Sequence, residues 1–251
     1  MNNQDTFIPF RIIQNRQENS RTNTLVFDQP LIGAQPGQFV MLWLPGIGEK
    51  PYSILNSDPF SVAVTAVGLF SENLIAGKAG ERVWVRGPYG QGFQLSGCRL
   101  LFAGGGYGAA PLLFLAQKAR QNQNEVKVCL GARTAGDLIL VNDFQRLGCE
   151  VLVSTNDGSA GETGLVTQLV ESINSAFGTD MLYACGPVAM LSSLAVYCRN
   201  NSLASQLSWE AQMRCGIGLC GSCELDNDLR VLAGIPAGWL TCKDGPVFKS
   251  P

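Results

Sequence analysis

The hydrophobic pattern of the chain changes its period near residue 98. Before that point, short segments rich in Val, Phe, Trp and Thr are separated by Gly, Pro and Asn, which is typical of strands joined by turns. Val62 and Val64 alternate with smaller or polar neighbours, as in a strand with one buried face. The pattern predicts a small antiparallel β-barrel, with strands over residues 22–28, 37–45, 60–67 and 82–87.

After residue 98, buried apolar strands alternate with helices. The predicted strands cover residues 99–105, 125–132, 150–155 and 180–186. The predicted helices cover residues 111–122, 140–148, 164–175 and 187–200. Because strands that alternate with helices form parallel, doubly wound sheets, we expect ligands at the carboxyl ends of these strands. The fold class is therefore multi-domain, a β-barrel followed by an α/β domain, and residues 201–251 show few helical signals.

Length, charge and the N-terminal residues narrow the class of protein. A chain of 251 residues can bury real cores without disulfides or zinc. The opening MNNQDTFIPF has no basic start followed by an apolar run, so we expect no secretory signal and a reducing, cytoplasmic location. Glycines and a proline interrupt the uncharged run 100–117, which argues against a membrane span. A net charge of -2 gives no electrostatic pattern for nucleic acid.

Two features of the composition bear on the chemistry. Charged residues make up 15% of the chain, against about 25% in typical soluble domains, so either a partner covers part of the surface or the core is large. The chain has no histidine, which excludes Ser-His and Cys-His catalytic pairs and histidine zinc sites. We therefore expect bound cofactors to supply the chemistry.

The stretch FAGGGYGAAP lies where the first strand of the second part ends. Gly104, Gly106 and Ala109 fit the pattern G-x-G-x-x-A, in which glycines let backbone N–H groups approach a pyrophosphate. A Gly-rich turn that serves only close packing would show the same sequence pattern. Arg133 stands where this fingerprint expects an acidic residue, so the choice between NADH and NADPH stays open.

Three further stretches have both a binding and a structural interpretation. In EKPYSI, Lys50 can meet a phosphate, Tyr52 a flat ring and Ser53 a ring nitrogen, or the segment is a turn that leads into a strand. In GLFSENL, Ser71 is expected to cap a helix. The free N–H groups at the start of that helix bind a phosphate in one interpretation, and in the other Ser71 only caps the helix. The Gly-rich loop VRGPYGQGF has the same ambiguity.

The nine cysteines fall into different groups. Cys185, in YACGP, is expected at the ligand-binding edge of the sheet, although a buried, inert thiol fits the spacing as well. The spacing C-x4-C-x2-C with a fourth cysteine downstream is the plant-type pattern for a 2Fe–2S cluster, and zinc ribbons usually show two C-x-x-C pairs instead. The predicted ligands are Cys215, Cys220, Cys223 and Cys242, and we interpret Cys98, Cys129, Cys149 and Cys198 as small apolar residues.

Taken in order, these motifs, together with STNDGSAGETG and TCKDGPVF, resemble one family: the iron–sulfur electron-transfer subunit of class 1B dihydroorotate dehydrogenase, within the ferredoxin reductase superfamily. The resemblance spans residues 10–248. It implies an FAD-binding β-barrel domain over residues 1–97, an NAD-binding α/β domain over residues 98–205 and a 2Fe–2S domain over residues 206–251.

The resemblance also implies roles for individual residues. The family's flavin motif commonly begins with Arg, so Lys50 keeps the charge but loses the bidentate fork. Ser53 and Cys185 match catalytic positions, and the four cysteines named above match the cluster ligands. The implied cofactor-binding residues are Lys50, Pro51, Tyr52, Ser53, Gly68, Ser71, Gly87, Pro88, Gly90, Gly104, Gly105, Gly106, Gly108, Gly186 and Pro187.

The function implied by the resemblance is an electron relay. NADH delivers a hydride to FAD, and single electrons pass through the cluster, framed by Ile217, Leu219 and Trp239, to or from an FMN-containing catalytic subunit of pyrimidine biosynthesis. That partner would hold the dihydroorotate site, in a heterotetramer. Two alternatives remain: the same relay serving a sulfur reductase, a hydrogenase or a ferredoxin:NADP oxidoreductase, and a zinc-bound scaffold or redox sensor.

Overall fold

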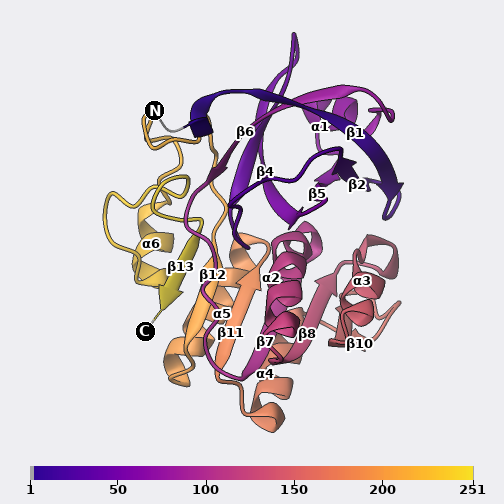
Figure 1. Cartoon of the computed structure of the whole chain (residues 1–251). Coiled ribbons are helices and arrows are strands. Elements are labelled where there is room, and N and C mark those ends of the chain that lie inside the picture. Colours follow the sequence, from indigo (N-terminus) through magenta and orange to yellow (C-terminus); the bar gives the residue numbers. More distant parts are fainter. Residues whose placement is uncertain (1–2, 251) are drawn as a thin grey trace.

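Six antiparallel strands close into a β-barrel in the N-terminal part of the chain, as predicted (Figure 1). The computed structural model describes residues 3–250. A short 3₁₀ turn (Asn3–Asp5) precedes the barrel, and α1 (Leu69–Ile75) lies between its last two strands. The strands, in the order β1-β2-β5-β4-β3-β6, are β1 (Ile8–Gln17), β2 (Thr22–Phe27), β3 (Phe39–Leu44), β4 (Gly48–Ser57), β5 (Phe60–Thr65) and β6 (Arg82–Tyr89).

Alternating apolar side chains fill the barrel. Leu25 and Phe27 on β2 are fully buried, as are the alternating Val62 and Val64 on β5. The rings of Phe27 and Phe60 stack with their centroids 4.9 Å apart. The alternation expected here is confirmed for Val62, Val64 and the half-buried Ala63 and Thr65, whereas Ser61 is buried as well and the strand ends at Thr65.

The second part of the chain is a doubly wound sheet of seven strands in the order β10-β9-β8-β7-β11-β12-β13. Its first six strands pair in parallel, as predicted, and the last is antiparallel. The strands are β7 (Arg99–Gly105), β8 (Glu125–Ala132), β9 (Glu150–Thr155), β10 (Glu162–Thr163), β11 (Met181–Cys185), β12 (Ser205–Ser208) and β13 (Val247–Ser250).

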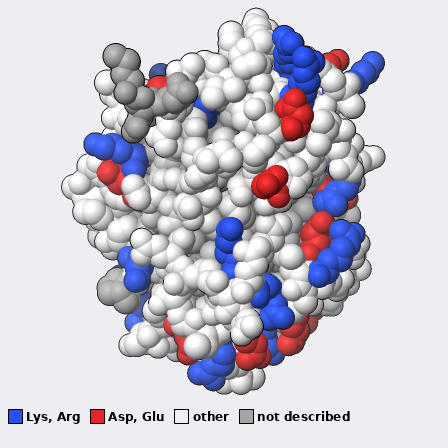
Figure 2. Space-filling view, in the orientation of Figure 1, with Lys and Arg blue, Asp and Glu red and all other residues white. Residues whose placement is uncertain are grey.

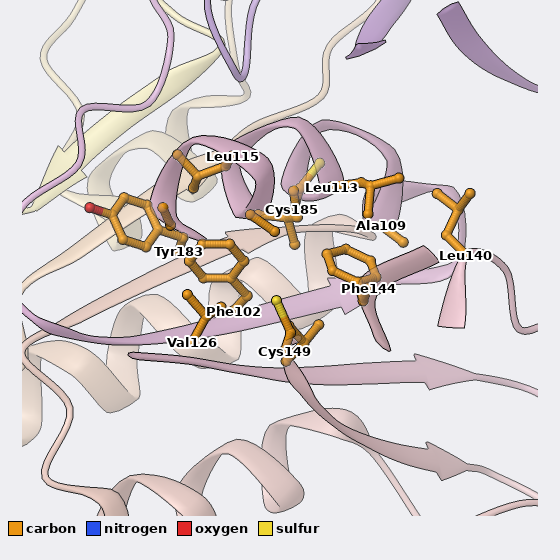
Figure 3. Close-up of a cluster of buried hydrophobic side chains, with 14 of the residues drawn as sticks. Phe102, Ala109, Leu113, Leu115, Val126, Leu140, Phe144, Cys149, Tyr183 and Cys185 are labelled. Carbon is orange, nitrogen blue, oxygen red and sulfur yellow. The ribbon is translucent and has the colours of Figure 1, made fainter. Parts of the chain in front are cut away.

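Helices cover both faces of this sheet. Side chains of α2 (Ala109–Gln121) and α3 (Val141–Arg146) form one core with β7, β8 and β11 (Figure 3). Side chains of α4 (Val166–Phe177) and α5 (Val188–Asn200) form the core on the other face. Figure 3 shows Phe102 of β7 beside Tyr183 of β11, and their rings meet edge to face at 5.3 Å.

The segment that carries the four cysteines is inserted between β12 and β13. In the described part of this segment there is one helix, α6 (Asn227–Ala233). It begins after Asp226, whose side chain accepts a hydrogen bond from Asp228 N, and it ends at Gly234, which has a left-handed conformation. The predicted boundary between residues 205 and 206 falls inside β12. β13 lies beyond that boundary, yet it completes the sheet of the α/β domain.

The barrel and the α/β domain share a tight interface. Phe114 of α2 packs in the barrel core, and Arg16 of β1 forms an ion pair with Asp143 of α3 at 3.2 Å. Charges of both signs are interspersed over the face in Figure 2, and most of that face is uncharged. Among the described residues, no helix is long and apolar enough to cross a membrane.

Candidate functional site

A cleft of about 710 Å³ lies where β7, β8 and β11 reach their carboxyl ends. This is the edge of a doubly wound sheet where ligands are expected, and β7 is the strand at which the order reverses. Residues of the barrel close the opposite side of the cleft. The predicted residues that line it are Gly105, Gly106 and Pro187, and the barrel contributes Asn19, Arg21, Thr22, Thr65 and Val67.

The glycines of FAGGGYGAAP have different roles. A Cβ at Gly104 would lie 2.8 Å from Leu130, and a Cβ at Gly108 would overlap the carbonyl of Cys185, so both glycines permit close packing. Gly106 has a φ of +54° and open space beside it, on the wall of the cleft. Gly106 is therefore the position at which the backbone can approach a ligand.

The electrostatics of the cleft fit an anionic nucleotide. Arg133, at the end of β8, and Arg21 of the barrel both line the cleft, and Asp137 is the acid nearby on the same wall. Pro187 precedes α5, which, among the described residues, has no capping side chain at its start. Its first N–H groups are therefore free to meet a phosphate.

Glu210 is a candidate that the sequence analysis missed. It follows β12 and accepts a hydrogen bond from the Tyr107 hydroxyl, which lines the cleft, at 3.1 Å. Burial is the main cause that raises the pKa of Cys185 to about 12, and the negative charge of Glu210 adds to the effect. Cys185 is 3% exposed and thus stays a neutral thiol behind the cleft. No motif pointed to Glu210. It reaches the cleft only because β12, which ends at Ser208, pairs with β11, where Ser208 lies opposite Cys185.

The flavin motif lies on β4, which is a ten-residue strand. β4 pairs with β5 only from Ile54 onward, so the described contacts of Pro51 in the sheet are those with β3. A proline is tolerated there because it has no N–H to donate. The exposed Lys50 and the half-buried Tyr52, whose ring stacks on Phe70 at 6.2 Å, lie on this open edge. Burial raises the pKa of Tyr52, so its hydroxyl stays protonated.

The start of α1 differs in detail from the expectation. Gly68, not Ser71, is the N-cap, and Ser71 is the third residue of the helix. The Ser71 hydroxyl accepts hydrogen bonds from the N–H groups of Val67 and Gly68, at 2.9 and 3.2 Å. Val67 and Leu69, beside the Phe70 that stacks on Tyr52 of β4, are 75% and 70% exposed. Two such apolar side chains fit a surface that a flat ring covers.

Gly87 and Pro88 lie on β6 and not in the predicted loop, and the turn after β6 that holds Gly90 packs against the C-terminal segment. Gln91 N donates a hydrogen bond to the carbonyl of Gly245, and a Cβ at Gly90 would lie 2.5 Å from the same oxygen. None of these three residues lines the described cleft. Their assignment to a cofactor stays a prediction, whereas their packing role is visible.

The four predicted cluster ligands come together as two pairs of thiols. Cys223 and Cys242 are buried, and their Sγ atoms lie 3.2 Å apart. Hydrogen bonds from Ser222, and then from Cys215, lower the pKa of the exposed Cys220 to about 6. Among the described residues, no three metal-binding side chains converge on a single point. The close Cys223–Cys242 pair and the lowered pKa of Cys220 beside Cys215 fit side chains that act as thiolate ligands.

Backbone N–H groups of residues 214–224, which we call the cluster loop, point at these sulfurs. Gly218 N donates to Cys242 Sγ at 3.1 Å, and Leu219 N donates to Cys215 Sγ at 3.3 Å. Gly216, Gly218 and Gly221 all have φ values between +71° and +78°. The loop therefore needs glycine for its shape, and the donor set fits a thiolate-bound cluster.

The cluster loop rests on the barrel. The thiols of Cys223 and Cys242 share one buried group with Phe39 and Met41 of β3 and with Tyr89 of β6. On the other side, Leu219 is 81% exposed and Ile217 43% exposed, while Trp239 is buried. Of the three residues expected to frame the cluster, Trp239 thus packs in the core, whereas Ile217 and Leu219 reach the surface. Cys98 is also exposed, unlike Cys129, Cys149 and Cys198.

Comparisons with known proteins agree with this geometry. Residues 210–251 match the family model of the iron–sulfur cluster binding domain of dihydroorotate dehydrogenase B, and residues 102–195 match the oxidoreductase NAD-binding domain. Two relatives are named as probable electron transfer subunits of dihydroorotate dehydrogenase B (NAD(+)). The one from Methanopyrus kandleri is 37% identical over 96% of this chain and 89% of its own. The one from Thermococcus kodakarensis is 39% identical over 85% and 84%.

Solved structures show the same fold. The structure of an NADH-dependent reduced ferredoxin-NADP oxidoreductase matches 96% of this chain and 87% of its own, with a TM-score of 0.83 and 28% identity. The FAD/NAD-binding domain of a nitric oxide dioxygenase from Vibrio cholerae matches in fold, with a TM-score of 0.68, 20% identity and coverage of 78% and 93%.

The fold, the cleft and the paired thiols define an NAD-linked oxidoreductase of the ferredoxin reductase type, with FAD, a 2Fe–2S cluster and NADH as its cofactors. Within that class, the chain belongs to the family of dihydroorotate dehydrogenase B electron transfer subunits. The resemblance drawn from the motifs is therefore confirmed.

Proposed function

We propose that this chain carries electrons between NAD(H) and the flavin-containing catalytic subunit of a dihydroorotate dehydrogenase, in pyrimidine biosynthesis. The proposal rests on the spatial arrangement of three sites at the boundary between the barrel and the rest of the chain. The nucleotide cleft, the open edge of β4 and the paired thiols follow one another, and β3 joins the last two.

When bound, FAD would supply the two-electron chemistry with NADH and the one-electron chemistry with a 2Fe–2S cluster. The chain's own residues bind and orient these groups. Gly106, Pro187 and Arg133 hold the nucleotide in the cleft. Ser53 and the neutral thiol of Cys185 are the catalytic candidates, the first on the flavin strand and the second behind the nucleotide.

We assign the flavin to the open edge of β4 and the loop before α1, with Lys50, Pro51, Tyr52, Ser53, Gly68 and Ser71 as its contacts. The remaining nucleotide contacts in this assignment are Gly104, Gly105, Gly108 and Gly186. The cluster ligands are Cys215, Cys220, Cys223 and Cys242. Their two-by-two arrangement and the N–H groups that face the sulfurs support this assignment.

The division of the chain into functional domains is also part of the proposal. The barrel (1–97) holds FAD, the α/β domain (98–205) holds the nucleotide and the C-terminal part (206–251) holds the cluster. We propose a cytoplasmic heterotetramer with two copies of each subunit. The exposed Leu219 and Ile217 beside the half-buried Cys215 support a partner docked at this end.

Reconstitution with the catalytic subunit tests the function. The chain is expected to form a complex with that subunit and to support reduction of NAD⁺ by dihydroorotate, whereas neither chain does so alone. The variant Cys223→Ser, which loses a buried cluster ligand, is expected to abolish the coupled reaction. Tight binding of orotate to the isolated chain would contradict the proposal, because it places the pyrimidine site in the partner.

A second candidate is the same relay with another partner. The high structural similarity to a ferredoxin-NADP oxidoreductase favours it as the alternative. A chain that reduces dyes with NADH, yet neither binds the dihydroorotate dehydrogenase catalytic subunit nor couples to it, would establish this candidate. Purification from the native host would then identify the partner that is actually bound.

A further inference from the structure

Arg86 is a buried cation between the barrel and the cluster loop. It lies on β6 and is 9% exposed. Each guanidinium nitrogen donates a hydrogen bond: Nε to Glu49 Oε1 at 2.6 Å, Nη1 to the Tyr89 hydroxyl at 3.1 Å and Nη2 to the Cys215 carbonyl at 2.7 Å. Its Cζ also lies 5.4 Å from the ring centroids of Phe7 and Tyr89.

These contacts fix the guanidinium relative to the cluster loop. The planar fork of an arginine directs its donors rigidly, so the bond to Cys215 sets the backbone of the first cluster ligand. Glu49 immediately precedes Lys50 on β4. Arg86 therefore ties the strand of the flavin motif to the loop that holds the thiols.

Among the described residues, Glu49 is the carboxylate that forms an ion pair with Arg86, and Asp5 contacts the Tyr89 hydroxyl beside it. Glu49 is 26% exposed at its side chain, which is more than Arg86. Burial raises the pKa of Tyr89 to about 12, so its hydroxyl stays neutral, and Gln4 O and Asp5 Oδ1, at 2.8 and 2.9 Å, are the two acceptors within reach of its one proton. The guanidinium thus lies nearer to the cluster loop than the carboxylate that offsets it, since it contacts Cys215 directly.

We propose that Arg86 is a positioning residue that holds the cluster loop and raises the reduction potential of the bound cluster, while Glu49 lowers it. This inference rests on the proposed function. Uptake of one electron makes the thiolate-bound site more negative by one unit. The fixed charge of the buried Arg86, in contact with the backbone of Cys215, favours that state, and a carboxylate disfavours it.

The test is the midpoint potential of the cluster in four variants of the intact chain. It is measured by a redox titration that is monitored by electron paramagnetic resonance. Arg86→Met is expected to lower the potential and Glu49→Gln to raise it. The double variant is expected to lie between them. Arg86→Lys keeps the charge but loses the fork, so we expect a smaller shift than in Arg86→Met together with weaker retention of iron and sulfide.

Arg82→Met is the matched control, because Arg82 is exposed on the same strand. We expect this variant to keep the wild-type potential. A purely structural role of the pair would make every variant lose cluster without opposite shifts. Shifts of the same sign in Arg86→Met and Glu49→Gln, or no shift in either, would overturn the proposal.

If Arg86→Met does not retain a cluster, Glu49→Gln and Arg86→Lys still decide the sign. Failure of this inference is distinct from failure of the proposed function. A wild-type chain without any cluster signal would contradict the function itself. A wild-type chain with a normal signal, and variants without the opposite shifts, would contradict only the role of Arg86.

Discussion

Phe39 lies directly opposite Ser53 in the β3–β4 ladder, and its side chain packs in the same buried group as Cys223 and Cys242. One strand therefore separates the flavin motif from the buried pair of cluster thiols. Because a barrel strand is held by hydrogen bonds on both sides, the relation between the two sites is rigid. Electron transfer between them needs no domain movement.

Loss of one buried thiol should remove the cluster and leave the flavin. Cys223→Ser is expected to lose most iron and sulfide but to keep FAD, because Cys223 contacts β3 and not the open edge of β4. Metal and flavin analysis of the purified variant measures this. The exposed Cys98 provides the control Cys98→Ser, which should keep both cofactors. Full iron content in Cys223→Ser would contradict the ligand assignment.

Arg133 should contribute to nucleotide binding. It lines the cleft at the end of β8, so Arg133→Ala is expected to raise KM about tenfold, or about 1.4 kcal/mol, with little change in kcat. The rise should be larger for NADPH than for NADH, since NADPH carries one more phosphate. Steady-state dye reduction measures both. Arg146→Ala, at an exposed position on α3, is the control, and equal effects in the two variants would contradict the role of Arg133.

Gly108 should be intolerant of a side chain for a steric reason. A Cβ there would overlap the Cys185 carbonyl, so Gly108→Ala must displace α2 from β11. We expect a loss of about 1–3 kcal/mol in the free energy of unfolding. Denaturant unfolding measures the loss. In the control Gly136→Ala, the added atom meets only Thr134 Oγ1 at 3.7 Å, so little change is expected. Equal stabilities of the two variants would argue against this packing.

Buried thiols should make the fold sensitive to alkali. Burial raises the pKa of Cys129 from 9.0 to about 12. A raised pKa of an acid means that the folded chain holds the proton more tightly than the unfolded chain. The contribution is therefore complete below about pH 9 and is lost as the pH rises toward 12.

The variant Cys129→Ala isolates this contribution. Between pH 9 and 10.5 its stability should fall less steeply with pH than that of the wild type, by up to about 1.4 kcal/mol per pH unit. Unfolding curves at several pH values measure the slopes. Identical slopes for Cys129→Ala and the wild type would contradict the prediction.

The sequence predicted the βα alternation well because its strands are buried on both faces and its helices are long. Residues 99–105 and 180–186, for example, match β7 and β11 within one residue. β1 was missed because Pro9, Arg11 and the polar residues 14–17 obscure its alternation. β12 and β13 were not recognised as partners, since 38 residues separate them and only the tertiary fold pairs them.

The candidate site also contains residues that the sequence predicts and residues that only the tertiary fold brings together. The thiol spacing is local, so the four cysteines could be grouped from sequence alone. Glu210 and Arg86 could not, because each reaches its partner across strands: Glu210 meets Tyr107, and Arg86 meets Glu49 and Cys215. The first contact depends on the strand order of the α/β sheet and the second on the packing of the cluster loop against the barrel, and the linear pattern contains neither.

The most direct test of the relay is an anaerobic visible absorption spectrum of the purified chain, recorded before and after addition of NADH. Overlapping flavin and iron–sulfur bands that bleach on addition of NADH are the result that the account predicts. A chain that stays colourless after reconstitution with FAD, iron and sulfide, and that binds zinc at its cysteines, would contradict it.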